Sequence, residues 1–393
     1  MVGPVRADGV KVLVIANDGD AFLRHRLGVV ERLASLGADV VVMAGGSAPP
    51  PSRIAGWRFR HTAIDRLSIS PLNNLLLFAR LAEAIDEFDP EIVHLITLKP
   101  AVLGGIAAAR RARRTGRPTR ILITIPGLGR LMSPHGLGVG IATYPVRKAV
   151  SLVIRWLSRQ PQVSFSFETV GDRQHWIDQG LIREDNSHVV NGAGVDPEKF
   201  YPAAATGQRT RLRFLFASRL LRSKGLDDFL SAAREFAGRA DFIVAGWNDP
   251  RDADDFPAEE LERETAITFL GPVEDMPELL RSVDVVCLPT RYGEGIPRIL
   301  IEAAATGLAC VASEQSGTRM IVRDGRTGIL LKSPQSIATE LAAAIGAYIA
   351  DPGLARIHGE AALLHFHDAG FDERAVVSHF VKLLGVEEGS PVS

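Results

Sequence analysis

Short apolar runs alternate with longer segments of helical periodicity along most of the chain. The apolar runs lack the strict polar–apolar alternation of a half-exposed strand, so we interpret them as strands buried on both faces. Such strands alternating with helices predict parallel sheets covered by helices on both sides. The predicted strands are 11–16, 39–44, 91–95, 120–124, 163–167, 187–190, 212–217, 241–245, 266–270, 283–288 and 309–313.

The alternation is interrupted by the loop-rich segment 201–208, which we interpret as the connection between two domains. The prediction is an α/β protein with two Rossmann-like, doubly wound parallel-sheet domains, 1–200 and 201–370. The last helical segment, within 370–393, is expected to pack back on the first domain. Because open sheets of this class bind ligands beyond the carboxyl ends of their strands, we expect the site in a central cleft between the domains.

Composition narrows the class of protein without deciding its chemistry. The chain has 393 residues and a formal net charge of -1, so no general affinity for nucleic acid is expected. Its two cysteines, Cys287 and Cys310, lie in apolar runs and suggest neither a disulfide framework nor a metal site. No signal-peptide core and no run of about 18 apolar residues is visible, so a cytoplasmic location is expected.

The most informative segment is 291–302, which follows the predicted strand 283–288. Its pattern predicts a loop carrying Glu294 and a helix that starts at Pro297 and carries Glu302. Backbone N–H groups at a helix start favour a diphosphate. Glu302 would then accept hydrogen bonds from a ribose, and Glu294 would reach the attached sugar. The residues expected to line the diphosphate are Gly295, Ile296 and Pro297.

Two cations, Arg219 and Lys224, follow the first predicted strand of the second domain, and Gly225 opens the next helix. At the carboxyl edge of the sheet they would neutralise a diphosphate and stabilise it as a leaving group. A solvated basic turn is the alternative, since Lys and Arg are mostly surface residues. The glutamate segment 291–302 in the same domain favours the functional interpretation.

These segments together resemble the retaining family-4 glycosyltransferases of GT-B fold, and the resemblance covers nearly the whole chain. Two glutamates separated by seven residues are weakly specific alone, but the signal is strong when the lysine loop and the interdomain segment accompany them in order. The segments that carry the resemblance are Glu294 to Glu302, Arg219 to Gly225, 317–328 and 192–202.

The resemblance implies a role for each matching residue. Glu302 would bind the ribose of the nucleotide, and Arg219 with Lys224 would hold the diphosphate. Glu294 would contact the donor sugar. Catalysis by Glu294, Lys224 and Arg219 would be mostly electrostatic, with a UDP-sugar as donor, no metal cofactor and retention of the anomeric configuration.

Two positions depart from the family pattern, and both bear on the donor-sugar pocket. Met320 stands where the family often has Glu. Pro126 stands about where many members carry a histidine close to the reacting sugar.

The first domain resembles a subset of the family that elongates lipid-linked surface glycans, through the segments 93–100 and 124–129. Thr97 and Lys99 follow the third predicted strand, so we expect them at the cleft. Lys99 could contact an acceptor phosphate there. A surface lysine at a helix start is the alternative. Gly19, after the first strand, could allow the acceptor or the diphosphate to approach, although an ordinary turn is equally compatible with the sequence.

The segment 144–159 mixes cations with apolar residues, and Trp156 within it could lie at a membrane interface. A second group of arginines lies between 110 and 120. Charge runs are usually solvated faces, but a near-neutral chain that concentrates positive charge in one domain favours docking on an anionic bilayer. A lipid-linked acceptor at the inner face of the plasma membrane fits this hypothesis.

Three other functions compete with the transferase. A UDP-sugar 2-epimerase of the same fold would need no lipid acceptor, and the basic segment 144–159 argues against it. A dehydrogenase of Rossmann type would need a Gly-x-Gly-x-x-Gly turn after the first strand, where 17–20 reads Asn-Asp-Gly-Asp. Met320 and Pro126 favour a noncatalytic nucleotide-binding partner subunit, but the presence of Glu294, Lys224 and Glu302 weighs more against it.

Overall fold

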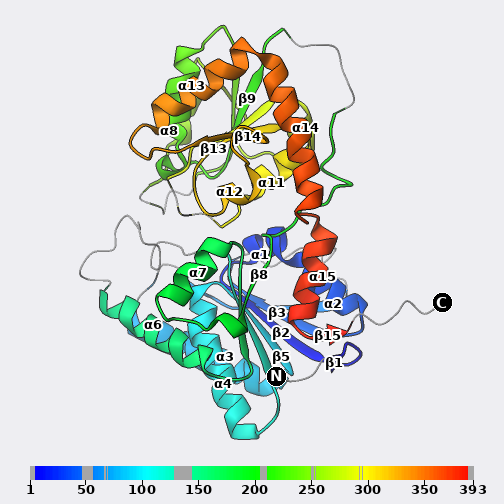
Figure 1. Ribbon diagram of the computed structural model, residues 1–393. Helices are drawn as coiled ribbons and strands as arrows, with labels where there is room; N and C mark the ends of the chain where they lie inside the picture. The colour runs from blue at the N-terminus through cyan, green and yellow to red at the C-terminus, as the bar shows by residue number, and fades with distance from the viewer. Residues whose placement is uncertain are drawn as a thin grey trace, which may run out of the picture. The chain divides into compact units, whose positions relative to one another are not determined.

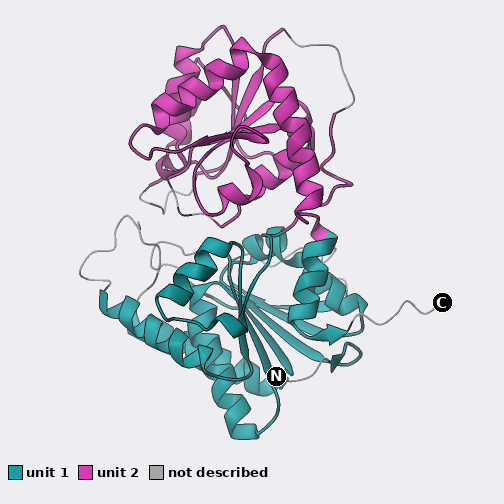
Figure 2. Ribbon diagram, in the orientation of Figure 1, with its two compact units in different colours: residues 1–193, 374–393 teal, residues 194–373 magenta. Residues whose placement is uncertain are grey.

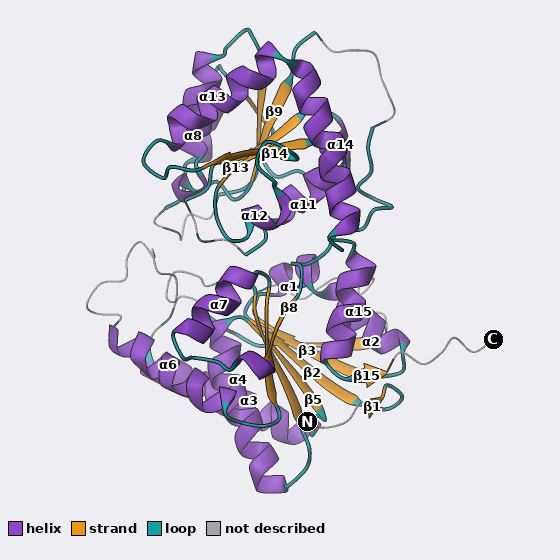
Figure 3. Cartoon of the chain, viewed as in Figure 1, coloured by secondary structure: helices purple, strands orange, loops and turns teal. Residues whose placement is uncertain are grey.

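The computed structural model describes residues 5–46, 56–65, 68, 70–127, 144–203, 210–248, 252, 254–291, 293 and 295–387. The chain divides into two compact units, unit 1 with residues 1–193 and 374–393, and unit 2 with residues 194–373 (Figure 2). Each unit contains a parallel sheet flanked by helices (Figures 1 and 3). The predicted α/β class with two parallel sheets is confirmed.

Unit 1 is built on a seven-stranded parallel sheet in the order β4-β3-β2-β5-β6-β7-β8. Its strands are buried on both faces, as in β2, where Leu13 and Ile15 belong to one apolar cluster and Val12 and Val14 to another. This two-sided burial explains why strands such as β2 and β3 show no regular alternation of polar and apolar residues, whereas the edge strand β4 is partly exposed. The strands are β2 (Lys11–Ala16), β3 (Asp39–Ala44), β4 (Trp57–His61), β5 (Ile92–Ile96), β6 (Arg120–Ile125), β7 (Val163–Phe167) and β8 (Ser187–Val189).

Two groups of helices bury the two faces of this sheet. One apolar cluster joins the sheet to α3 (Pro71–Phe88), α4 (Leu98–Thr115), α6 (Tyr144–Ser158) and α7 (Val170–Asp178). The other joins it to α1 (Gly19–His25), α2 (Leu27–Ser35) and α15 (Glu373–Leu383). A short turn, η3 (Glu184–Asn186), and a small sheet of β1 (Val5–Arg6) with β15 (Val386–Glu387) complete the unit.

The single helix suggested by the periodicity of 22–36 is two helices, because the chain breaks at Arg26. The Arg26 guanidinium is buried and forms an ion pair with Glu168, with 2.8 Å between Nη2 and Oε1. It also donates to the carbonyl of Gly192 at 3.2 Å and lies 4.9 Å from the ring centre of Phe380. A charge can stay buried only when paired and hydrogen-bonded, so these contacts explain where the helix breaks.

Unit 2 contains a six-stranded parallel sheet in the order β11-β10-β9-β12-β13-β14. Its strands are likewise covered on both faces, by one apolar cluster on each side. The last strand, β14, was not among the predicted ones, since it is short and follows a turn signal. The strands are β9 (Arg213–Ala217), β10 (Asp241–Ala245), β11 (Thr268–Phe269), β12 (Val285–Leu288), β13 (Ala309–Ser313) and β14 (Gly328–Leu331).

The helices of unit 2 follow the strands in βα alternation. Helix α11 starts one residue later than predicted, because Pro297 is its N-cap in an extended conformation, and Gly307 follows its end with φ +74°. Among the described helices of the whole chain, none has the length and hydropathy required to cross a bilayer. The elements are η4 (Arg222–Lys224), α8 (Leu226–Glu235), α9 (Ala258–Glu262), α10 (Met276–Arg281), α11 (Arg298–Ala305), α12 (Thr318–Ile321), α13 (Ile337–Ala350) and α14 (Pro352–Asp368).

Replacing Phe380 with alanine should destabilise unit 1, because this ring of α15 is 1% exposed and packs against His94 and Arg26. We expect a loss of about 3–5 kcal/mol in the free energy of unfolding, measured by urea denaturation. Lys382→Ala, on the exposed face of the same helix, should change it by less than about 0.5 kcal/mol. Similar small losses for both variants would show that α15 is not part of the unit 1 core.

Candidate functional site

The carboxyl edge of the unit 2 sheet has the topology of a ligand site. From β9 the chain continues to β10 and β11 on one side and then returns to β12 on the other side of β9. The loops that follow β9 and β12 therefore diverge at this edge, and open α/β sheets bind ligands at such switch points. These two loops, 218–225 and 289–297, carry most of the site residues predicted for this unit.

Two glycines bring the loops of this edge into backbone contact. Gly225 has φ +83°, and a Cβ added there would lie 2.1 Å from the carbonyl oxygen of Pro289. A Cβ on Gly317 would lie 1.5 Å from the carbonyl oxygen of Gly295. Only glycine permits such close approach, so these residues join the loop after β12 to the loops after β9 and β13.

Lys224 ends the short turn η4 and is only 8% exposed. Burial, reinforced by the positive charge of Arg219, lowers the pKa of Lys224 to about 7. Arg219 is half-buried on the same loop. The structure therefore brings together the two cations predicted to hold a diphosphate, and an anion placed beside them would relieve both the desolvation and the repulsion.

Glu302 is 8% exposed on α11, and Arg298, one turn earlier, donates from Nε to its Oε1 at 2.7 Å. Burial raises the pKa of the Glu302 carboxyl, while Arg298 acts in the opposite direction. The ion pair orients the carboxylate that was predicted to accept from a ribose. Arg298 was not among the predicted site residues, although its spacing of four from Glu302 is the signal that could have found it.

The loop between β12 and α11 is described only in part. Glu294, the predicted contact of the donor sugar, lies outside the described residues, whereas Gly295, Ile296 and Pro297 are described and lead into α11. Met320, the departure from the family pattern, packs partly buried against the apolar cluster of this face. Its carbonyl oxygen lies 2.9 Å from Nε2 of His365, so this residue helps to fix α12.

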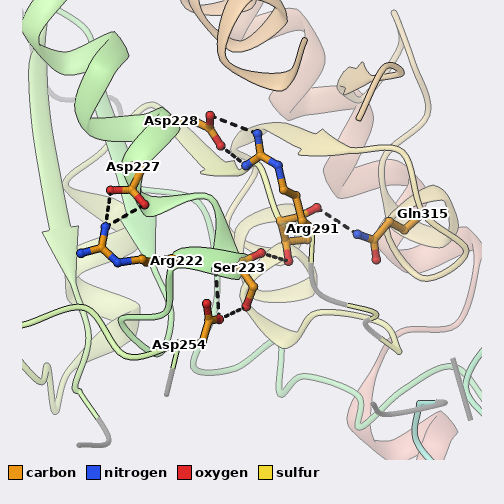
Figure 4. Close-up of polar contacts among 8 residues, drawn as sticks. Arg222, Ser223, Asp227, Asp228, Asp254, Arg291 and Gln315 are labelled. Carbon is orange, nitrogen blue, oxygen red and sulfur yellow. Dashed lines mark hydrogen bonds and ion pairs between the residues drawn. The ribbon is translucent and has the colours of Figure 1, made fainter. Parts of the chain in front are cut away.

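A hydrogen-bond network surrounds the turn that carries Lys224 (Figure 4). Asp254 accepts from Ser223, and the backbone N–H of Arg291 donates to the Ser223 carbonyl at 2.7 Å. The Arg291 guanidinium forms an ion pair with Asp228 on α8, and Gln315 donates to the Thr290 carbonyl at 2.9 Å. No local motif indicated this network, since its partners come from loops far apart in the sequence.

In unit 1 the sheet order reverses between β2 and β5, and Gly19 and Thr97 lie in the segments after these strands. Thr97 has φ +76°, an outlier for a β-branched residue. Within the described part of the chain, its buried Oγ1 and Oδ1 of Asn17 have no hydrogen-bond partner. The amide of Gly19 donates to the carbonyl of Gly45 at 2.8 Å, so this N–H is already engaged.

Lys99, the predicted acceptor contact, turns toward a neighbouring loop. Its Nζ donates to the carbonyl oxygens of Asp65 at 2.5 Å and Ser68 at 2.7 Å. Burial lowers the pKa of the Lys99 amine, and the charge of Asp65 opposes that shift. The side chain lines a cavity of about 240 Å³ together with Asn73 and Arg80.

Two basic regions of unit 1 are arranged differently from each other. Half of the six arginines between 110 and 120 form ion pairs with aspartates, since Arg111 and Arg117 share Asp89 and Arg114 pairs with Asp86. Helix α6, in contrast, exposes cations and apolar side chains along one face. The exposed residues of this face include Tyr144, Lys148, Leu152 and Arg155, and the exposed Arg159 directly follows the helix. Trp156 is partly buried and packs against Arg113.

Two further residues of unit 1 also have defined places. His94 is buried in β5, with 2.8 Å between its Nε2 and Oγ1 of Thr124. Burial lowers the pKa of His94 to about 3, so it stays neutral at physiological pH. Pro126 directly follows β6 at the carboxyl edge of the sheet.

Two family models match the chain, one within each unit. A Glycosyl transferase 4-like model matches residues 11–152, and a Glycosyl transferases group 1 model matches residues 211–351.

Curated relatives extend this match. A lipopolysaccharide core biosynthesis mannosyltransferase of Rhizobium leguminosarum bv. viciae is 31% identical over 251 residues, which cover 55% of this chain and 69% of the relative. An N,N'-diacetylbacillosaminyl-diphospho-undecaprenol alpha-1,3-N-acetylgalactosaminyltransferase of Campylobacter jejuni is 22% identical over 390 residues, covering 95% of this chain and 98% of the relative. A UDP-Gal:alpha-D-GlcNAc-diphosphoundecaprenol alpha-1,3-galactosyltransferase of Escherichia coli is 25% identical and covers 67% of this chain and 68% of the relative.

Solved structures share the fold at low identity. The Anabaena protein HepE in complex with UDP and glucose matches with a TM-score of 0.74 and 18% identity, covering 95% of this chain and 99% of that chain. A sucrose-phosphate synthase of Thermosynechococcus elongatus matches with a TM-score of 0.73 and 19% identity, covering 95% and 98%. The predicted GT-B fold is confirmed. The family models and the relatives show that this chain belongs to the group 1, family-4-like glycosyltransferases.

Proposed function

We propose that this glycosyltransferase moves a hexose or an N-acetylhexosamine from a UDP-sugar to a polyprenyl-diphosphate-linked acceptor, with retention of configuration. The observation that carries the proposal is the buried Lys224 beside Arg219 at the switch point of the unit 2 sheet. Two relatives are named for undecaprenyl-diphosphate-linked substrates, and one structural neighbour was solved with UDP.

In this proposal the donor lies along the carboxyl edge of unit 2. Lys224 and Arg219 neutralise the diphosphate. They also stabilise the negative charge that develops on it as the bond to the sugar breaks. Backbone groups at the start of α11 add a partial positive charge. Glu302, oriented by Arg298, accepts from the ribose hydroxyls, and Glu294 contacts the sugar. No metal is required, since the two cations supply the charge.

The acceptor is proposed to bind unit 1 at the edge that carries Gly19 and Thr97. Oγ1 of Thr97 and Oδ1 of Asn17 are buried and have no hydrogen-bond partner within the described residues, so a local rearrangement would let them accept from glycan hydroxyls. Lys99 would contact an acceptor phosphate only after its hydrogen bonds to the carbonyls of Asp65 and Ser68 break, or if the phosphate enters the adjacent cavity that Lys99 lines. Thr97 and Lys99 therefore each need a local rearrangement before they contact the acceptor.

Donor use can be tested with three variants. We expect UDP to bind the wild type with a thermal shift, and Lys224→Met to lose most of that binding because the diphosphate loses its buried cation. Glu294→Gln should keep UDP binding and lose sugar transfer by about a hundredfold or more, followed by hydrolysis or transfer of a labelled UDP-sugar. Glu278→Gln, a surface change on α10, is the control for both assays. Wild-type preference for GDP, or unchanged transfer in Glu294→Gln, would contradict the assignment.

The affinity for UDP should fall as the pH rises above about 7. In the free protein the Lys224 amine is mostly neutral above its pKa of about 7, whereas a bound diphosphate favours the ammonium. Binding therefore takes up a proton, and the affinity should weaken by nearly tenfold per pH unit from about pH 7.5 to about pH 9. Lys224→Arg, which stays charged, should show almost no such slope by calorimetry. A flat profile in the wild type would exclude a depressed pKa at Lys224.

We also propose that α6 docks unit 1 on the anionic cytoplasmic face of the membrane. Tyr144 is 59% exposed and Leu152 is 64% exposed on the face that presents Lys148 and Arg155. Exposed apolar side chains interleaved with cations are typical of helices that lie in a membrane interface. Arg155 also donates hydrogen bonds to the carbonyls of Gln179 and Gly180, so only part of its guanidinium is available to lipid headgroups.

Docking predicts sedimentation with phosphatidylserine vesicles and not with phosphatidylcholine vesicles. Lys148→Ala should weaken the interaction by about fivefold, since one cation near such a surface contributes about 1 kcal/mol. Arg356→Ala, an exposed cation on α14, is the matched control and should bind as the wild type does. If the wild type does not bind these vesicles, or if Lys148→Ala binds them as the wild type does, the proposal that α6 docks on the membrane is wrong.

A further inference from the structure

The position of Lys224 is determined by residues outside its own loop. The preceding residue, Ser223, donates to a single carboxylate oxygen, Oδ2 of Asp254, from both its Oγ and its backbone N, the latter at 3.1 Å (Figure 4). On the other side, the Ser223 carbonyl accepts from the backbone N of Arg291 at 2.7 Å and from Oγ1 of Thr290 at 3.4 Å. Ser223 is therefore held between the segment after β10 and the loop after β12.

The segment 254–256 pairs with the Lys224 loop over several residues. The backbone N of Arg222 donates to the Asp254 carbonyl at 3.0 Å, and the backbone N of Phe256 donates to the Leu220 carbonyl at 2.8 Å. An antiparallel bridge joins Leu221 to Asp255 between these bonds. The Asp254 carboxylate therefore lies at one end of this short antiparallel pairing and binds Ser223, the residue before Lys224.

Asp254 is connected to the Lys224 turn through Ser223. The influences on the Lys224 amine are burial first and Arg219 second, and Asp254 is not among them. A long side chain reaches solvent easily when its backbone can move, so a buried amine needs a fixed loop to stay in place. The two hydrogen bonds from Ser223 to Asp254 supply that restraint.

We propose that Asp254 is a positioning residue for donor binding, because its carboxylate holds Ser223 and so fixes the turn that presents Lys224 to the donor's diphosphate. This inference rests on the proposed function and deepens it. Asp254 itself does not touch the donor. Its effect should therefore appear in the affinity for nucleoside diphosphate and in how that affinity depends on pH.

The test is calorimetric titration of UDP into the wild type and three variants at about pH 7.5 and about pH 9. Asp254→Ala should weaken binding by about tenfold or more, since a displaced cation loses its aligned contact. Asp254→Asn should weaken it by less than about threefold, because an amide oxygen can still accept both bonds from Ser223. Asp227→Asn is the matched control, since Asp227 pairs with Arg222 at the surface of the same region and does not contact Ser223.

The pH dependence separates positioning from a merely structural role. If the turn is released, Lys224 gains solvent and its pKa rises, so the fall in UDP affinity with pH should flatten in Asp254→Ala and persist in Asp254→Asn and Asp227→Asn. A structural role alone would lower the melting temperature and leave both the affinity of the folded protein and its slope unchanged. That result, or equal losses in Asp254→Ala and Asp254→Asn, would overturn the proposal.

Two further titrations keep the outcome decisive. If Asp254→Ala does not fold, Ser223→Ala removes the Oγ bond alone, and a loss of about threefold with a flatter slope supports the proposal, while wild-type behaviour contradicts it. Lys224→Met tests the proposed function separately. If it binds UDP as the wild type does, the diphosphate assignment itself fails, and with it the positioning role, whatever Asp254→Ala does.

Discussion

The arrangement of the unit 2 loops depends on keeping the Lys224 amine buried. Burying an ammonium costs free energy that a flexible loop would recover by releasing the side chain to water. Here the backbone on both sides of Lys224 is held, by Asp254 and Arg291 through Ser223, and by the close contact of Gly225 with Pro289. The protein without ligand thus carries the desolvation cost of the buried ammonium. A diphosphate that binds beside Lys224 can offset this cost.

Unit 1 contains a buried charge that is paired within the protein. Arg26 has a carboxylate partner in Glu168, a backbone acceptor in Gly192 and an aromatic neighbour in Phe380. These contacts join the first helical segment, the end of β7, the last residues before unit 2, and α15. A buried ion pair adds little net stability, but removing one partner is costly, so this cluster specifies how the separate parts of unit 1 pack. Burial lowers the pKa of Lys224, the buried cation of unit 2, which suits a binding site for an anion.

The elements that the sequence predicted well are those whose burial is uniform. Strands such as β2 and β10 are nearly continuous apolar runs, and their bounds match the predicted ones. Strand β4 escaped prediction because it lies at the sheet edge and alternates arginine with aromatic residues. The arginines between 110 and 120 form a basic cluster in the sequence, but three of them form ion pairs with Asp86 and Asp89 in the fold. Charge patterns mislead where the compensating residues lie far along the chain.

The sequence alone determined the fold class and the residue types available for donor chemistry, because hydrophobic periodicity and motif spacing are local properties. It identified Arg219, Lys224 and Glu302 as a set, and it matched them to a family. Only the tertiary structure decided how each is held. Lys224 is buried and restrained by Asp254, Glu302 is paired with Arg298, and Lys99 is turned toward the carbonyls of Asp65 and Ser68. Most of these partners lie on loops that meet only when the sheets form, and the same contacts bury the side chains. The hydrogen bonds and pKa shifts of the site residues therefore could not be deduced from the order of residues.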